Sequence, residues 1–331
     1  MVEFLTEYGM FLAKSTTVVL LFLVAAGCIF VLLMRTRTNP QDEEHLEVKK
    51  LNEKYEQMSV ILKSATLPKK AFKQALKDLK IQHKEQQNVS DHTERKRVYV
   101  LKFQGDVRAS EVSSLREGIT AILTVATPID EVVVLLESAG GVVHGYGLAA
   151  SQLQRIRERG VTLTVVVDKV AASGGYMMAC VANRIIAAPF AIIGSIGVIG
   201  QMPNFNRLLK NLDIDYEQIT AGEYKRTLTV FGENTDKGRR KAQEELEDTH
   251  QLFKDFVLEN RTETDIETIA TGEHWYGRRA LELKLVDELC TSDDYLCAAA
   301  QQADIFLVKY SHRKRLVERL FASAASLFSG V

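Results

Sequence analysis

A serine between a strand-like run and a helical stretch is the first candidate for chemistry in this chain. The segment Ala172-Ser173-Gly174-Gly175 precedes Tyr176 to Ala182, which is helical in pattern, so Ser173 is expected near a helix N-terminus. The helix dipole and the free N–H groups there favour a developing negative charge. An ordinary N-cap serine suits the same position and is the commoner case.

A pair of glycines is the second candidate. Ser138-Ala139-Gly140-Gly141 follows an apolar run, and glycines at the end of a strand can turn backbone N–H groups outward. An oxyanion hole needs such donors, aimed at the oxygen that becomes charged. A plain tight turn explains the pair equally well.

A serine also needs a base before it can act as a nucleophile. The histidines suit this role poorly, because they fall in the terminal regions (His45, His83, His92, His312), in a charged helix (His250) or beside Trp275 (His274). His144 follows Gly141 closely, although it suits a surface turn equally well. The other candidate is Lys225, in Gly222-Glu223-Tyr224-Lys225, and a lysine serves as a base only when it is desolvated.

The elements that must position these residues alternate between strands and helices. Nearly all-apolar runs are typical of parallel strands covered on both faces, and such alternation predicts an α/β domain. Ligands bind at the carboxyl ends of the strands in these sheets, where both glycine-rich segments fall. The expected strands are 98–103, 131–136 and 161–167, and the expected helices are 112–125 and 146–159. The apolar run 187–199 contains Pro189 and two glycines, so we expect a buried strand and turn there.

Composition excludes several functions. The 331 residues include 42 basic and 43 acidic side chains, which gives no support to nucleic-acid binding. Four cysteines are too few for a disulfide framework, and a Cys290–Cys297 bond is possible but not indicated. No cysteine–histidine cluster has metal-ligand spacing, so we expect neither a metal site nor a cofactor.

The N-terminal region predicts a membrane anchor. Residues 15–34 are apolar and lie between Lys14 and Arg35, a length that spans a bilayer. A cleaved signal peptide is the rival interpretation, but the apolar run continues directly into Arg35 without a small-residue cleavage site. The basic residues that follow, Arg35, Arg37, Lys49 and Lys50, lean towards a cytoplasmic body by the positive-inside rule.

Residues 35–96 are charged and predict a helical stalk with a linker at 86–97. Apolar residues at helical spacing form two stripes, broken near Pro68: Val48, Leu51, Tyr55, Met58 and Leu62, then Phe72, Ala75, Leu76 and Leu79. The stalk is either a solvated spacer or a helix that pairs with a neighbouring subunit. At the other end, residues 311–331 form a basic amphipathic tail, which is either frayed or occupies the active groove.

Four segments together resemble the signal peptide peptidase A family of membrane-anchored serine proteases, most closely its SohB branch. These are Glu137 to Gly141, Ala172 to Tyr176, Gly194-Ser195-Ile196-Gly197, and Gly222 to Lys225, and the similarity covers roughly residues 97–300. Ala139 stands where the family often has proline, which removes no donor.

The resemblance implies a role for each residue. Ser173 would be the nucleophile, and Lys225, 52 residues later, the general base. Ser195 would hold the lysine amine, while Gly140 or Gly141 would form the oxyanion hole with Gly174. The implied fold is the Clp protease/crotonase type, a spiral of ββα units. The implied domain of residues 97–310 follows the flank 1–14, the anchor and the stalk.

The resemblance further implies an endopeptidase of the bacterial inner membrane, with a periplasmic body. Its substrates would be hydrophobic peptides such as cleaved signal peptides or membrane-proximal segments, and its subunits would form a homo-oligomer. A Clp-like protease would place a histidine where this chain has Val198. A crotonase-like acyl-thioester enzyme would need neither the serine–lysine pair nor an anchor, and the pair argues against a non-catalytic scaffold.

Overall fold

The computed structural model describes residues 2–36, 44–90 and 95–312. Residues 46–310 form one compact unit, and the N-terminal helix belongs to another. The predicted C-terminal tail lies outside the described residues, apart from its first two positions.

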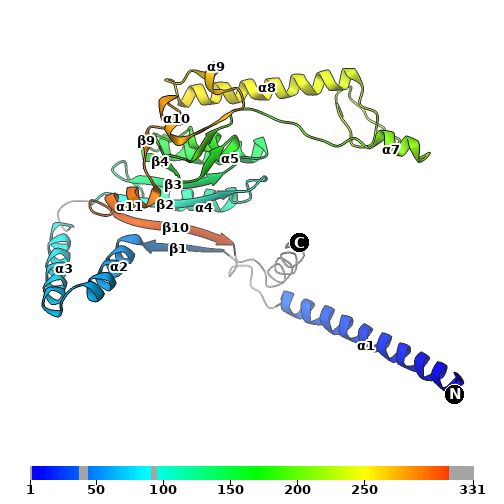
Figure 1. Ribbon diagram of the computed structural model, residues 1–331, viewed down its shortest axis with the longest axis horizontal. Coiled ribbons are helices and arrows are strands. Elements are labelled where there is room, and N and C mark those ends of the chain that lie inside the picture. Colours follow the sequence, from blue (N-terminus) through cyan, green and yellow to red (C-terminus); the bar gives the residue numbers. More distant parts are fainter. Residues whose placement is uncertain (1, 37–43, 91–94, 313–331) are drawn as a thin grey trace. The chain divides into compact units, whose positions relative to one another are not determined.

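A twisted, mainly parallel sheet forms the centre of the larger unit (Figure 1). Its order is β1-β10-β2-β3-β4-β6-β9, and every neighbouring pair from β10 to β9 runs parallel. Residues 132–134 of the central strand β3 are fully buried, as expected for a strand covered on both faces. The strands are β1 (Glu44–Lys50), β10 (Asp304–His312), β2 (Arg97–Gly105), β3 (Glu131–Ser138), β4 (Thr162–Val167), β6 (Arg184–Ala187) and β9 (Glu288–Leu289).

A second, shorter set of strands branches from the end of β3. Here β5 (Val170–Ala172) pairs with Ser138 of β3 and runs parallel to β7 (Ile192–Gly194). The strand β8 (His274–Tyr276) adds to β7 in the antiparallel direction. The predicted buried strand and turn in residues 187–199 is confirmed, with β7 as its strand.

Amphipathic helices cover the sheet. In α4 (Val112–Leu123) and α5 (Val143–Glu158) the buried residues recur at helical spacing, so that each helix presents one apolar face to the strands. The predicted α/β architecture is therefore confirmed. The remaining short helices of this body are α6 (Gly174–Ala179), α9 (Ile266–Ile269), α10 (Gly277–Glu282) and α11 (Ser292–Ala299).

A long helix carries an exposed segment that projects from the body. The helix α8 (Asp236–Asn260) has 25 residues, about 37 Å, and buries Phe253 and Val257 near its C-terminal end. Residues 200–235, here called the arm, precede it and contain α7 (Asn206–Asn211), which lies far from the sheet in Figure 1. The side-chain bonds of the arm stay within it or reach the first turns of α8, as between Asn204 and Gly232 or Glu223 and Lys237.

The predicted anchor lies in the N-terminal helix α1 (Val2–Thr36). Residues Thr6–Cys28 are long and apolar enough to cross a membrane, so the candidate span begins before the predicted residue 15. Thr16 and Thr17 donate their hydroxyls to carbonyl oxygens one turn earlier, which satisfies these polar groups within the helix.

The predicted helix through Val48 is wrong at its start. Residues Glu44–Lys50 form the edge strand β1 beside β10, and α2 begins only at Leu51. The cause lies far along the chain, because the Asn52 side chain bonds Ala300 O, Ala303 O and the N–H of Ile305. Pairing with the free edge of β10 outweighs a helical pattern of only a few residues.

The predicted break at Pro68 is confirmed. The helix α2 (Leu51–Thr66) ends before it and α3 (Lys69–Ser90) begins directly after it. The linker predicted from residue 86 starts later, because α3 continues to Ser90, and residues 91–94 lie outside the described part.

Candidate active site

Ser173 occupies a strained turn between β5 and α6. Its φ of 51° and ψ of −120° are unusual for a residue with a side chain, and such strain persists only where the surroundings impose it. The Ser173 N–H donates to Gly194 O (2.8 Å), and the Met177 N–H donates to Ser173 O (3.0 Å). Its hydroxyl makes no capping bond to α6, so Ser173 is not the ordinary N-cap serine that the sequence also allowed. The half-buried side chain is thus available for another partner.

The glycine pair lies directly against this serine. Gly140 has a φ of +91°, and a Cβ added to it would stand 2.8 Å from Ser173 Cβ and 2.8 Å from Gly174 N. A Cβ on Gly141 would stand 2.1 Å from Val107 O, so neither glycine tolerates a side chain. The structure therefore brings the predicted oxyanion residues Gly140, Gly141 and Gly174 together with Ser173.

Of the backbone N–H groups of these three glycines, one donates a hydrogen bond and two have no acceptor among the described residues. Gly140 donates its N–H to Ser138 Oγ (3.0 Å). The N–H groups of Gly141 and Gly174 have no acceptor within the described residues. Donors left open beside a nucleophile are what an oxyanion requires.

Ser195 lies at the end of the neighbouring strand. The register of β5 and β7 pairs Ala172 with Gly194. Ser173 and Ser195 are the next residues after this pair, one at the end of each strand. Ser195 also has a positive φ, 51°, and its hydroxyl donates to Gly272 O (3.3 Å). The predicted lysine-orienting residue is therefore close to the nucleophile.

Lys225 is not brought to these residues within the described chain. It lies in the arm, its side chain is exposed, and its backbone N–H bonds Gly222 O. A lysine in water is not desolvated, which a general base of this kind requires. One chain therefore assembles the serine half of the predicted site without its base.

The alternative base, His144, is exposed in the first turn of α5. His250 lies on α8, and its buried Nε2 has no hydrogen-bond partner within the described residues.

Cys290 and Cys297 are free thiols, and no group of three His, Cys, Asp or Glu side chains in the described segments is placed to hold a metal ion.

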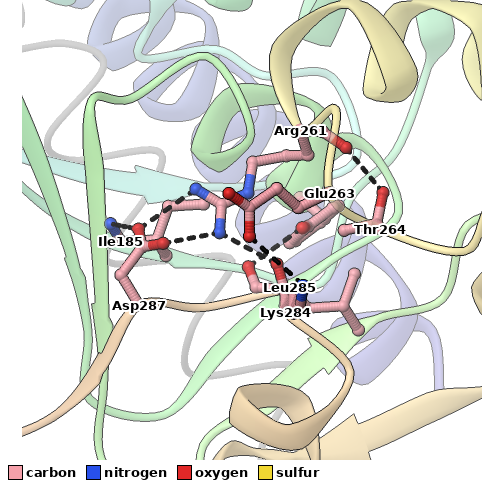
Figure 2. A network of polar contacts seen from close by, with 8 residues as sticks. Ile185, Arg261, Glu263, Thr264, Lys284, Leu285 and Asp287 are labelled. Carbon is pink, nitrogen blue, oxygen red and sulfur yellow. Dashed lines mark hydrogen bonds and ion pairs between the residues drawn. The ribbon is translucent and has the colours of Figure 1, made fainter.

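A polar network ties the helix after Ser173 to the rest of the body (Figure 2). On α6, the buried Tyr176 hydroxyl donates to Leu285 O (2.9 Å), and burial raises the pKa of this phenol, which keeps it a neutral donor. Arg261, at the end of α8, forms two bonds to the Asp287 carboxylate (2.7 and 3.1 Å) and a third to Lys284 O (2.9 Å). Asp287 accepts in turn from the N–H of Ile185 (2.7 Å).

This network predicts a large stability difference between two arginines. The Arg261 side chain is only 11% exposed, so Arg261→Ala leaves the Asp287 carboxylate without its ion pair. We expect a loss of about 3 kcal/mol in the free energy of unfolding, measured by urea titration in detergent. The control is Arg279→Ala, which breaks the exposed pair with Glu282 and should cost under about 1 kcal/mol. Equal losses from the two changes would contradict the assigned role of the network.

Sequence reasoning missed the partners that hold these turns. Ser138 lies in the Glu137 to Gly141 segment, yet nothing in the sequence pattern indicates that its hydroxyl accepts the Gly140 N–H. Tyr146 was expected only as a helical residue, although it lies under the site. The Arg261–Asp287 pair is separated by 26 residues, and no local signal identifies it.

Comparison with known proteins identifies the family of this chain. The description "Peptidase family S49 N-terminal" matches residues 3–153, and "Peptidase family S49" matches residues 155–305. A probable protease SohB of Haemophilus influenzae is 48% identical over 327 residues, covering 96% of this chain and 92% of that protein. A probable protease SohB of Buchnera aphidicola subsp. Acyrthosiphon pisum is 58% identical over 229 residues, covering 69% of this chain and 68% of that protein.

Among solved structures, a mutant of the 1510-N membrane-bound stomatin-specific protease is similar with a TM-score of 0.42. It is 12% identical, and the match covers 62% of this chain and 85% of that one. The sequence matches span nearly the whole chain, including the segments that carry Ser173 and both glycines. The protein is a protease whose N-terminal helix is long and apolar enough to cross a membrane, and it belongs to peptidase family S49, in the SohB branch.

Proposed function

We propose that this protein is a membrane-anchored serine endopeptidase that uses Ser173 and Lys225. The observation that carries the proposal is the serine half of the site: a strained Ser173 beside two open N–H groups, those of Gly141 and Gly174. A nucleophile with oxyanion donors suits acyl transfer.

In the proposed reaction, Ser173 Oγ attacks the peptide carbonyl while neutral Lys225 Nζ takes the hydroxyl proton. The negative charge passes to the carbonyl oxygen, which the Gly141 and Gly174 N–H groups stabilise. Lys225 then protonates the departing amine, leaving an acyl-serine that water hydrolyses by the reverse sequence of proton transfers. Ser195 would accept from or donate to the lysine amine and hold it in place.

We further propose that Lys225 acts on the serine of a neighbouring subunit. The arm that carries it bonds mainly to itself, and its apolar side chains face solvent in a single chain, as an interface surface does. Burial against a second copy would also desolvate the lysine. The exposed apolar residues of the arm are Met202, Phe205, Leu208, Leu212, Ile214, Tyr216, Ile219, Tyr224 and Phe231.

The proposed substrates are hydrophobic peptides, such as cleaved signal peptides, or membrane-proximal segments of other proteins. The anchor in α1 supports this choice because it holds the body beside the bilayer. We place the protein in the bacterial inner membrane as a single-pass homo-oligomer with a periplasmic body, as the family resemblance implies.

A serine-directed probe tests this function. Full-length protein in membranes is treated with a fluorophosphonate, which phosphonylates activated serines, and the adduct is mapped by mass spectrometry. We expect an adduct on the peptide that contains Ser173, and none on that peptide in the Ser173→Ala variant. An adduct only at another serine, or none on the wild-type protein, would contradict the proposal.

A further inference from the structure

Two buried hydroxyl groups lie directly beneath the candidate active site. Ser138, the last residue of β3, is 1% exposed, and Tyr146, on α5, is fully buried. Their oxygen atoms are 2.5 Å apart. Neither side chain reaches the surface, so neither can contact a peptide substrate.

The direction of each hydrogen bond around this pair follows from the number of protons. The Tyr146 hydroxyl has one hydrogen, and it donates to Asp106 O (2.8 Å), which can only accept. The bond between the two hydroxyls must therefore be donated by Ser138. Ser138 Oγ then keeps its lone pairs for the Gly140 N–H (3.0 Å). The result is a one-way chain from Gly140 through Ser138 and Tyr146 to Asp106.

This series of hydrogen bonds decides which glycine N–H group is able to donate to an oxyanion. The Gly140 N–H is committed to Ser138, whereas the Gly141 N–H has no acceptor within the described residues. Gly141 is held from the other side, because the N–H of Val142 donates to Val107 O (2.8 Å). The turn is thus fixed at both ends, and the exposed Gly141 keeps an N–H group without an acceptor among the described residues.

The ring of Tyr146 supports the second donor. A Cβ added to Gly174 would stand 2.4 Å from Tyr146 Cγ, so the ring lies against the backbone of Gly174. A Cβ added to Gly105 would stand 2.3 Å from the tyrosine oxygen and 2.4 Å from Ser138 Oγ. Glycine at both positions lets the ring and the hydroxyl pair sit directly under the site.

We propose that Ser138 and Tyr146 are positioning residues for the oxyanion hole, with Gly141 and Gly174 as its donors. The hydrogen-bonded hydroxyl groups fix the conformation of the turn that contains the Gly141 N–H. The tyrosine ring packs against the backbone of Gly174 and fixes the position of its N–H. This inference rests on the proposed protease function. It assigns the donor role in the oxyanion hole to Gly141 and excludes Gly140 from that role.

The test compares Ser138→Ala and Tyr146→Phe in the full-length protein, with a fluorogenic hydrophobic peptide as substrate. Because a donor displaced by about 1 Å costs up to about 100-fold, we expect kcat to fall about 10-fold to 100-fold. KM should stay within about twofold of wild type, since the peptide touches neither side chain. Inhibition by a peptide aldehyde, whose adduct carries the oxyanion, should weaken in parallel with kcat. The double variant should lose no more than the worse single variant, because both changes break one chain.

A matched control separates positioning from general stability. Tyr295→Phe removes the hydroxyl of a partly buried tyrosine, which bonds Glu131 at the opposite end of β3, about 23 Å along the strand from Ser138. This variant should keep the wild-type kcat. Unchanged kcat in Ser138→Ala and Tyr146→Phe, a rise in KM alone, or an equal fall in Tyr295→Phe would overturn the inference.

The outcomes also distinguish this inference from the function on which it rests. If the wild-type protein cleaves the peptide only with Ser173 intact, an unchanged kcat in both variants overturns the positioning role alone. If cleavage does not depend on Ser173, the proposed function fails and the positioning role fails with it. A faster hydrogen exchange of the Gly140 amide in Ser138→Ala, measured by mass spectrometry, reports the broken chain without any catalytic assay.

Discussion

The Ser173→Ala variant is expected to hydrolyse a hydrophobic peptide at least about 10³-fold more slowly than the wild-type protein, as judged by kcat/KM. The change removes the attacking oxygen but leaves the turn intact, because the bonds that hold it come from the backbone: Ser173 N–H to Gly194 O and Met177 N–H to Ser173 O. Stability should therefore change little. Alanine keeps the Cβ of serine and loses only the hydroxyl, so the substitution adds no new strain at this positive φ.

The control for this variant is Ser151→Ala. Ser151 is exposed on α5, and its hydroxyl donates to Gly147 O (3.0 Å) in its own helix. Activity should stay near the wild-type value there. A Ser173→Ala protein that is folded and keeps more than a tenth of the activity would contradict the role of Ser173 as nucleophile.

The Lys225→Ala variant is expected to lose activity by a similar factor, about 10³-fold, because the serine then has no base. Lys210→Ala is the matched control. Lys210 lies on the same arm, is also exposed, and pairs with Glu233, so its removal tests whether any lysine of the arm matters. Activity that survives Lys225→Ala, or falls equally in both variants, would contradict the role of Lys225 and direct attention to His144.

The meeting of three site segments could be predicted from the sequence because each follows a buried strand. Gly140 follows β3, Ser173 follows β5 and Ser195 follows β7, and the carboxyl ends of parallel strands share one edge. The periodicity of the helices between them was equally readable. The roles of these residues remain predictions that the experiments above test.

Features that depend on distant partners could not be predicted. The strand at Val48 forms because β10, more than 250 residues later, offers an edge and Asn52 bonds the residues around it. The chain from Gly140 to Asp106 joins β3, α5 and a loop, and no local pattern links them. The position of Lys225 depends on the arm, which is held largely by side-chain bonds between separate loops, such as those from Asn204 to Thr229 O and Gly232 O, and no periodic pattern indicates them.

One measurement tests the shared Ser173–Lys225 site most directly. Full-length Ser173→Ala and Lys225→Ala chains are co-expressed in equal amounts, and peptide hydrolysis by the mixed assembly is compared with each variant alone. In a ring where each subunit gives its serine to one site and its lysine to the next, about a quarter of the sites regain both groups, so activity should return to about a quarter of the wild-type value. Activity that stays at the level of the separate variants, although the two chains co-assemble, would contradict a site built from two subunits.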